Sequence, residues 1–153
     1  MSAKLIFDHA PLGAIIVYSD GTSRPPERHR RKLAAWKHRN GAGRLICKRA
    51  AVERDVNTIP ASFTLHEGDY GSNGTIVMRV HKTFDVTSPR DFVVSEQPEA
   101  GSVLVMSRPG DLGELVYLAA TRSEAEDWLT RHGYPEADLQ EVTVPAPDTG
   151  RAA

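Results

Sequence analysis

An Asn-Gly pair at residues 73–74 separates two segments, 61–67 and 75–86, in which apolar and polar side chains alternate. Asn-Gly favours a two-residue type I′ turn because both residues tolerate positive φ angles. Alternation with a period of two is typical of strands that bury one face. The sequence therefore predicts a central antiparallel hairpin, which the rest of the fold must accommodate.

A two-residue turn also defines the register of this hairpin. Phe63 lies opposite Phe84, and His66 lies opposite His81. Side-chain alternation indicates the same register, because the two phenylalanines fall on the apolar face and the two histidines on the polar face. A wide loop over residues 68–74, which contains extra glycines, is the competing arrangement.

Apolar runs bounded by turn residues predict further strands along the chain. The expected strands cover residues 4–8, 13–18, 44–51, 91–95, 102–108, 114–120 and 139–144. The first two of them are near enough in sequence to pair as a second hairpin.

A first helix is predicted over residues 26–40. It begins at Pro26, whose missing N–H would have no partner in a first helical turn in any case. It ends before Gly41 and Gly43, because glycine readily adopts the left-handed conformation that closes a last turn.

A second helix is predicted to begin at Ser123, because Ser123 and Glu126 match the S-x-x-E capping pattern. Its apolar face follows helical spacing. That face consists of Ala125, Trp128, Leu129 and His132. Gly133 is expected to end the helix.

These elements predict an α+β protein with mainly antiparallel sheet and two amphipathic helices, in a single domain over residues 1–144. An alternative organisation is a degenerate internal repeat, because the order β-β-α-β is expected in both 1–51 and 102–144. The central hairpin, 61–86, would then join the two halves. The tail, 145–153, is rich in Pro and Ala and is expected to be disordered.

Composition excludes several protein classes. The chain has 153 residues, of which 40% are hydrophobic and 25% charged, as in globular proteins and unlike collagen-like or low-complexity chains. Apolar runs such as 14–18 are far shorter than the roughly 20 residues that a membrane helix needs. No signal-peptide pattern is present, and Cys47 is the single cysteine, so a cytoplasmic protein without disulfides is expected.

Opposite charges gather in different parts of the chain, although the net charge is only −1. Residues 24–54 hold eleven Lys and Arg residues against two acids, whereas residues 99–153 hold ten acids against four Arg residues. Such a field can attract a polyanion to one side, pair the two segments within one chain, or orient a homo-oligomer.

Catalytic and metal-binding patterns are weak. His66 and His81 supply two imidazoles, but a zinc site takes three or four protein ligands, so no metal and no cofactor is predicted. Cys47 lies in an apolar strand and is expected to be a core residue. No catalytic residue is assigned, and a small enzyme with a site near the central hairpin is the third function class considered.

The helix over 26–40 is the candidate binding surface, because outside one apolar sector its residues are cationic or small. Cations on an exposed helix can neutralise phosphates and release counterions. The residues expected to contact phosphates are Arg28, Arg31, Lys32, Lys37 and Arg39, with Arg44 and Lys48 assisting. The predicted function is non-catalytic binding of nucleic-acid backbones without strong sequence specificity.

The same surface also fits a second class, a regulatory or inhibitory protein that binds an acidic partner protein, and self-association is compatible with either class. Binding of nucleic acid and binding of an acidic partner protein both require the cations of the helix to point into solvent. Ion pairs between them and the acidic C-terminal third of the same chain would remove the basis for binding.

Overall fold

The computed structural model describes residues 1–72 and 75–143. These residues form three helices and ten strands. The helices are α1 (Ala3–His9), α2 (Arg30–Arg39) and α3 (Arg122–Thr130). The strands are β1 (Ile15–Ser19), β2 (Gly41–Arg49), β3 (Val52–Glu53), β4 (Thr58–Ile59), β5 (Ser62–Ser72), β6 (Thr75–Asp85), β7 (Asp91–Glu96), β8 (Val103–Met106), β9 (Leu115–Ala119) and β10 (Asp138–Glu141).

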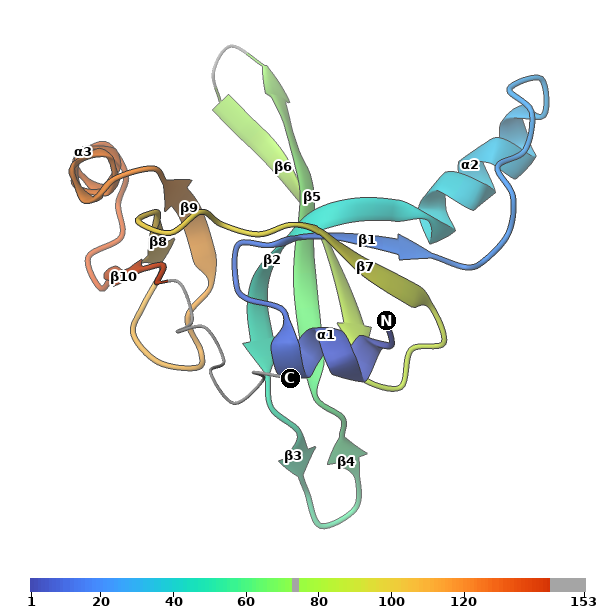
Figure 1. Ribbon diagram of the computed structural model, residues 1–153, viewed down its shortest axis with the longest axis horizontal. Helices are drawn as coiled ribbons and strands as arrows, with labels where there is room; N and C mark the ends of the chain where they lie inside the picture. Colours follow the sequence, from blue (N-terminus) through green and yellow to red (C-terminus); the bar gives the residue numbers. More distant parts are fainter. Residues whose placement is uncertain (73–74, 144–153) are drawn as a thin grey trace, which may run out of the picture.

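The strands form three sheets in which every pair of neighbours is antiparallel. The main sheet has the order β6-β5-β2-β1-β7, and a smaller sheet has the order β10-β8-β9. Strands β3 and β4 form a narrow extension of the main sheet (Figure 1). The α+β class with mainly antiparallel sheet is therefore confirmed.

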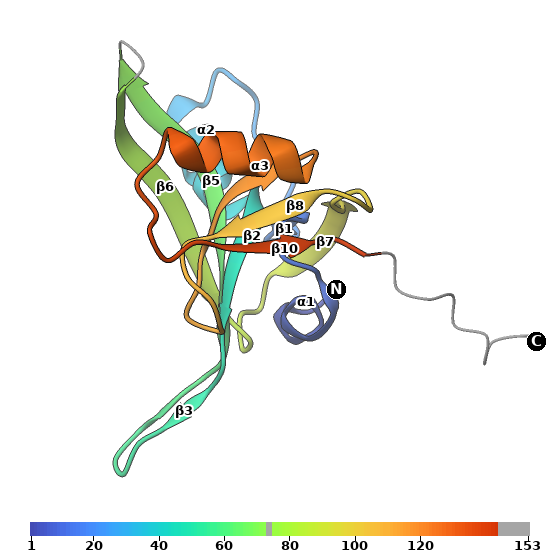
Figure 2. The same ribbon diagram turned by 90° about the vertical axis from the view of Figure 1, so that its left-hand side faces the viewer.

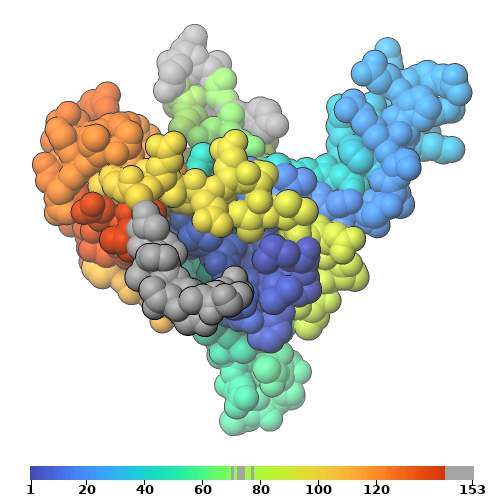
Figure 3. Space-filling model, viewed as in Figure 1, coloured from blue at the N-terminus to red at the C-terminus, as the bar shows by residue number. Residues whose placement is uncertain are grey.

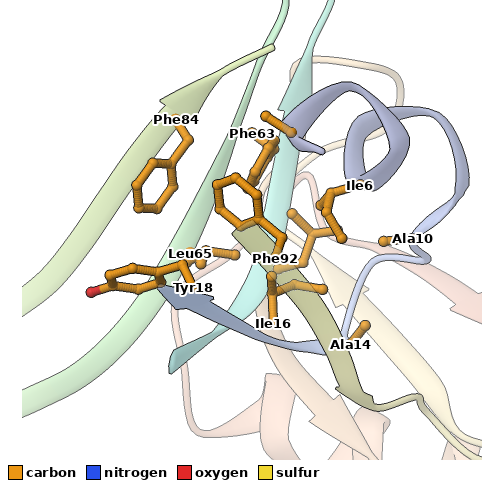
Figure 4. Packing of buried hydrophobic residues seen from close by; sticks show 11 residues of the cluster. Ile6, Ala10, Ala14, Ile16, Tyr18, Phe63, Leu65, Phe84 and Phe92 are labelled. Carbon is orange, nitrogen blue, oxygen red and sulfur yellow. The ribbon is translucent and has the colours of Figure 1, made fainter. Parts of the chain in front are cut away.

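The principal core lies between α1 and one face of the main sheet (Figure 4). Three phenylalanines from β5, β6 and β7 pack there, with ring centroids 5.2 to 5.8 Å apart. A second cluster joins the other side of β2 to the smaller sheet, where Ile46 and Cys47 contact Met106 and Leu115. Cys47 is buried, as its apolar surroundings predicted.

The central hairpin has the predicted register. Phe63 pairs with Phe84 and His66 with His81. Beyond this point the register shifts, because Glu67 is an extra residue between His66 and Gly68 and forms a β-bulge. Strand β5 also continues past the predicted end, so the hairpin is longer than expected. The Asn73-Gly74 turn itself lies outside the described residues, as does the expected tail.

The predicted strand at residues 4–8 is wrong, because this segment lies in α1. Ser2 caps the helix by accepting a hydrogen bond from the backbone N–H of Leu5. Ala3, Ile6 and Ala10 are buried at helical spacing. The N-terminal half consequently begins with a helix and lacks the β-β-α-β order on which the internal repeat was based.

The predicted role of Gly41 and Gly43 is also wrong. Asn40 is extended at the end of α2, and both glycines belong to β2 and have no positive φ angle. Their missing side chains instead allow residues of the neighbouring strands to approach the backbone of β2 closely. A Cβ atom at Gly41 would lie 2.7 Å from the Tyr18 hydroxyl oxygen, and one at Gly43 would lie 2.9 Å from the Leu65 Cβ. Helix α2 is shorter than predicted, because the segment before Arg30 forms a loop.

The cap of α3 lies two residues before the predicted one. The Thr121 hydroxyl accepts from the Glu124 backbone N–H, and the Glu124 carboxylate accepts from the Ala120 backbone N–H. Glu126 instead forms an i,i+4 ion pair with Arg122. The predicted buried positions Ala125 and Trp128 are confirmed. Thr121 and Glu124 match the S/T-x-x-E pattern as well as Ser123 and Glu126 do, so the motif alone left two starts open.

Helix α2 and the loop before it project from one side of the molecule, whereas α3 and the smaller sheet lie on the opposite side (Figures 1 and 3). Turned by 90°, the molecule shows α1 against the main sheet and the extended β3–β4 hairpin (Figure 2). None of the described helices combines the length and apolar character needed to span a bilayer.

The aromatic core predicts a large loss of stability when one ring is removed. Phe92→Ala should lower the free energy of unfolding by about 3–5 kcal/mol, because Phe92 is fully buried against two other rings. Urea unfolding followed by circular dichroism measures the change. Val93→Ala is the matched control, since Val93 is 57% exposed on the same strand. Equal losses in both variants would contradict this account of the core.

Candidate nucleic-acid interface

The basic arm, which we define as residues 20–39, comprises a loop and α2. Its seven Lys and Arg residues are all exposed. They are Arg24, Arg28, Arg30, Arg31, Lys32, Lys37 and Arg39. The arm contains only two acids, Asp20 and Glu27. Every cation that the sequence analysis placed on the first helix is thus on this arm.

Two ion pairs connect the cations of the arm to carboxylates. Arg39 Nε lies 2.9 Å from Asp20 Oδ2, and Arg24 lies 3.9 Å from Glu27. Among the described residues no carboxylate lies within 4.0 Å of the other five cations. The acidic C-terminal third does not cover the arm, because its described part lies on the far side of the molecule (Figure 3). The arm therefore presents cations to solvent.

Two cations from elsewhere in the chain hold the C-terminus of α2. Lys82 Nζ donates to the His38 carbonyl, and Arg90 Nη1 donates to the Arg39 carbonyl at 3.3 Å. The last carbonyls of a helix have no partner within the helix and carry a partial negative charge, so cations stabilise them. Lys82 and Arg90 thus fix the end of α2 that is nearest the sheet.

Asn40 completes this attachment. Its side-chain amide donates to the Trp36 carbonyl at 2.8 Å and accepts from the Asp20 backbone N–H at 3.0 Å. The Trp36 indole N–H donates in turn to the Thr22 carbonyl at 3.1 Å. These bonds close the loop onto the helix. A helix of ten residues is marginal in isolation, so these contacts are what maintain it.

A polar cluster of Tyr18, Glu67 and Lys82 lies at the end of α2, and Tyr18 is its buried member. The Tyr18 hydroxyl donates to the Glu67 carboxylate and accepts from Lys82 Nζ at 3.3 Å. Burial, followed by the hydrogen bond to Glu67, raises the pKa of Tyr18, so the phenol stays protonated. Burial lowers the pKa of Lys82. Tyr18, Glu67 and Lys82 were not predicted as residues of this interface, although two charged residues, Glu67 and Lys82, on the apolar face of a hairpin were a usable signal.

Arg44 and Lys48 lie apart from the basic arm. Arg44 Nη1 donates to the Gly13 carbonyl at 2.6 Å, which occupies it within the fold. Lys48 lies near the far end of β2, where it lines a hollow with Leu12 and Met106. Its partial burial lowers its pKa. The structure therefore brings five of the seven predicted contact residues together and places these two elsewhere.

The opposed histidines lie on the outer face of β5 and β6. Their rings form an edge-to-face pair with centroids 5.5 Å apart. His66 Nε2 lies 2.6 Å from Asp69 Oδ1, and His81 Nε2 lies 4.0 Å from Glu114 Oε1. Within residues 1–72 and 75–143 no three His, Cys, Asp or Glu side chains form a group that could hold a metal ion.

Asp20 at the base of the arm gives a titration test. Hydrogen bonds from the side chain and backbone of Thr22 lower the pKa of Asp20 to about 2. The carboxylate therefore stays ionised and paired with Arg39 until the pH falls through about 2. Thr22→Val removes the hydroxyl donor and should raise this pKa toward 3.8. Carboxyl chemical shifts followed by NMR across pH measure it.

Thr58→Val on the β3–β4 hairpin is the matched control and should leave the titration of Asp20 unchanged. If the pKa of Asp20 stays at about 2 in Thr22→Val, the Thr22 hydroxyl is not the main cause of the lowered pKa.

Comparison with known proteins identifies one family. No curated protein and no solved structure matches the chain. A family model matches residues 1–146, a stretch that includes the basic arm, its anchoring residues and every described strand. On this match the chain belongs to the family described as uncharacterised conserved protein UCP036055.

Proposed function

We propose that this protein binds nucleic acid without catalysis, through contacts between phosphates and the basic arm and without strong sequence specificity. The observation that carries the proposal is the exposure of five cations with no described carboxylate within 4.0 Å. They are Arg28, Arg30, Arg31, Lys32 and Lys37. Arg39 contributes from its ion pair with Asp20, whereas Arg44 and Lys48 are not part of the proposed interface.

The distribution of charge around α2 supports contacts along more than one side of the helix. At 100° per residue, Lys32 and Arg39 lie on one flank, and Arg30 and Lys37 lie on the other. A helix of ten residues is about 15 Å long, and duplex DNA carries one charge per ~1.7 Å of its axis. Several phosphates therefore come within reach at once.

The start of α2 is unfavourable in the protein alone. His29 makes no side-chain capping bond, and the first turn carries Arg30, Arg31 and Lys32 with no acid. Cations at a helix N-terminus oppose the helix dipole, and the first backbone N–H groups there lack partners. A bound phosphate would offset both costs, because it would bring negative charge and accept hydrogen bonds from the free N–H groups. Exposure to solvent alone gives no reason for three cations at the start of a helix.

The proposal also assigns the protein to the cytoplasm, where nucleic acid is accessible and a single buried thiol such as Cys47 stays reduced. An acidic surface of a partner protein would meet the same cations. A partner protein, however, does not present the regular array of phosphates that the spacing of these cations fits. Binding to such a partner instead of nucleic acid is one outcome of the test below.

A salt series tests the proposal. Fluorescence anisotropy with random-sequence 20-nucleotide DNA and RNA should show affinity that falls steeply as KCl rises from about 50 to 200 mM, because counterions are released. The double variant Lys32→Gln with Lys37→Gln should lower the slope of log affinity against log salt by about two, one for each lost phosphate contact.

The matched control is Lys4→Gln with Arg54→Gln, which removes two exposed cations outside the arm and should leave the slope unchanged. Absence of binding at low salt, or equal slopes in the two double variants, would overturn the proposal. Binding to polyglutamate in the absence of any binding to DNA or RNA would favour the acidic-partner class.

A further inference from the structure

An apolar hollow of about 410 Å³ lies beside the basic arm, between α2 and the outer face of the main sheet. Trp36 lines it from the helix, and Val17 and Ala42 line it from β1 and β2. Its volume falls within the range of small-molecule sites, which is about 300–1,000 Å³. The hollow therefore has room for a flat ring.

The floor of this hollow continues as a row of apolar side chains across three strands. Val17 pairs directly with Ala42 on β2 and with Val93 on β7. Val17 is 37% exposed and Val93 is 57% exposed. Neighbouring strands are about 4.8 Å apart, so the row extends roughly 10 Å over an open sheet face. Apolar side chains in a row, rather than scattered singly, offer a surface on which a flat ring can lie.

Trp36 is positioned to offer its ring rather than its polar group. Its indole N–H is already occupied by the Thr22 carbonyl, which holds the ring in place. Lys32 and Arg39 lie four residues before and three residues after Trp36, so they are its neighbours on the helix surface. An aromatic ring over an apolar floor thus lies between two cations.

We infer that the hollow and the basic arm together select single-stranded nucleic acid, with an unpaired base stacked on Trp36 and the next base over the row of Val17, Ala42 and Val93. This inference rests on the proposed function. The faces of bases in a duplex are covered by their neighbours, so only an unpaired strand supplies a flat apolar ring and phosphates side by side. Charge identifies the occupant, because the cations of the basic arm include Lys32, a neighbour of Trp36 on the helix surface with no described carboxylate within 4.0 Å. A neutral apolar ligand would leave this cation without a counter-charge.

Anisotropy with labelled dT20 and with a 20-base-pair duplex, at one salt concentration, tests the inference. Trp36→Ala should weaken dT20 binding about tenfold, as base stacking on an aromatic side chain contributes about 1–3 kcal/mol. Duplex affinity should change less than about twofold by the same reasoning. Trp36→Phe, which keeps a stacking ring, should retain most of the affinity for dT20.

A second variant removes any dependence on the folding of the arm. Val17→Thr with Val93→Thr makes the floor polar at the sheet and should weaken dT20 binding several-fold while duplex affinity is retained. Val52→Thr with Val56→Thr is the matched control, since these exposed valines lie on the β3–β4 extension. It should change neither affinity.

The outcomes separate the two proposals. Binding of both probes, with dT20 affinity unchanged in the Trp36→Ala and the double threonine variants, would overturn the inference and leave the proposed function standing. Failure of both probes to bind at low salt would overturn both. A parallel loss for dT20 and duplex in Trp36→Ala, with no effect of the double threonine variant, would assign Trp36 to holding the arm and would also overturn the inference.

Discussion

The hydrogen bonds of Lys82 are the contacts on which the presentation of the basic arm depends. Its ammonium group joins the buried Tyr18 hydroxyl to the His38 carbonyl at the end of α2. The Tyr18 ring reaches this position only because Gly41 leaves room beside its hydroxyl. Packing of the main sheet thus determines where a short, highly charged helix ends, while the rest of that helix extends into solvent. Contacts with the core therefore determine the position of α2, and the exposed side chains of the basic arm supply its charge.

The central hairpin and several further strands were predictable because their signals are local. A turn dipeptide and side-chain alternation suffice to align Phe63 with Phe84, since both act between neighbouring strands. The bulge at Glu67 was not predictable in this way. Its cause is tertiary, because the extra residue turns a carboxylate toward Tyr18 in the core. Alternation within one strand carries no information about such a partner.

The candidate site was predictable in composition and only partly in geometry. The charge run indicated a cationic helix, and its exposure agrees with that prediction. The run did not indicate where the polypeptide turns away, so it included Arg44 and Lys48, which continue along β2 into the fold. The strand predicted at residues 4–8 failed for a related reason. A short apolar segment fits either period, and a serine cap decides in favour of the helix.

The residues that anchor α2 come late in the chain. Lys82 and Arg90 are 44 and 51 residues beyond the carbonyls that they contact. Such distant contacts cannot form before both partners have been synthesised, and closing long loops costs entropy. A nascent chain therefore leaves the ribosome with its cationic segment exposed and unsupported while the hairpin that will hold it is still being synthesised. The side chains that end its helix are available only once Lys82 and Arg90 have been synthesised.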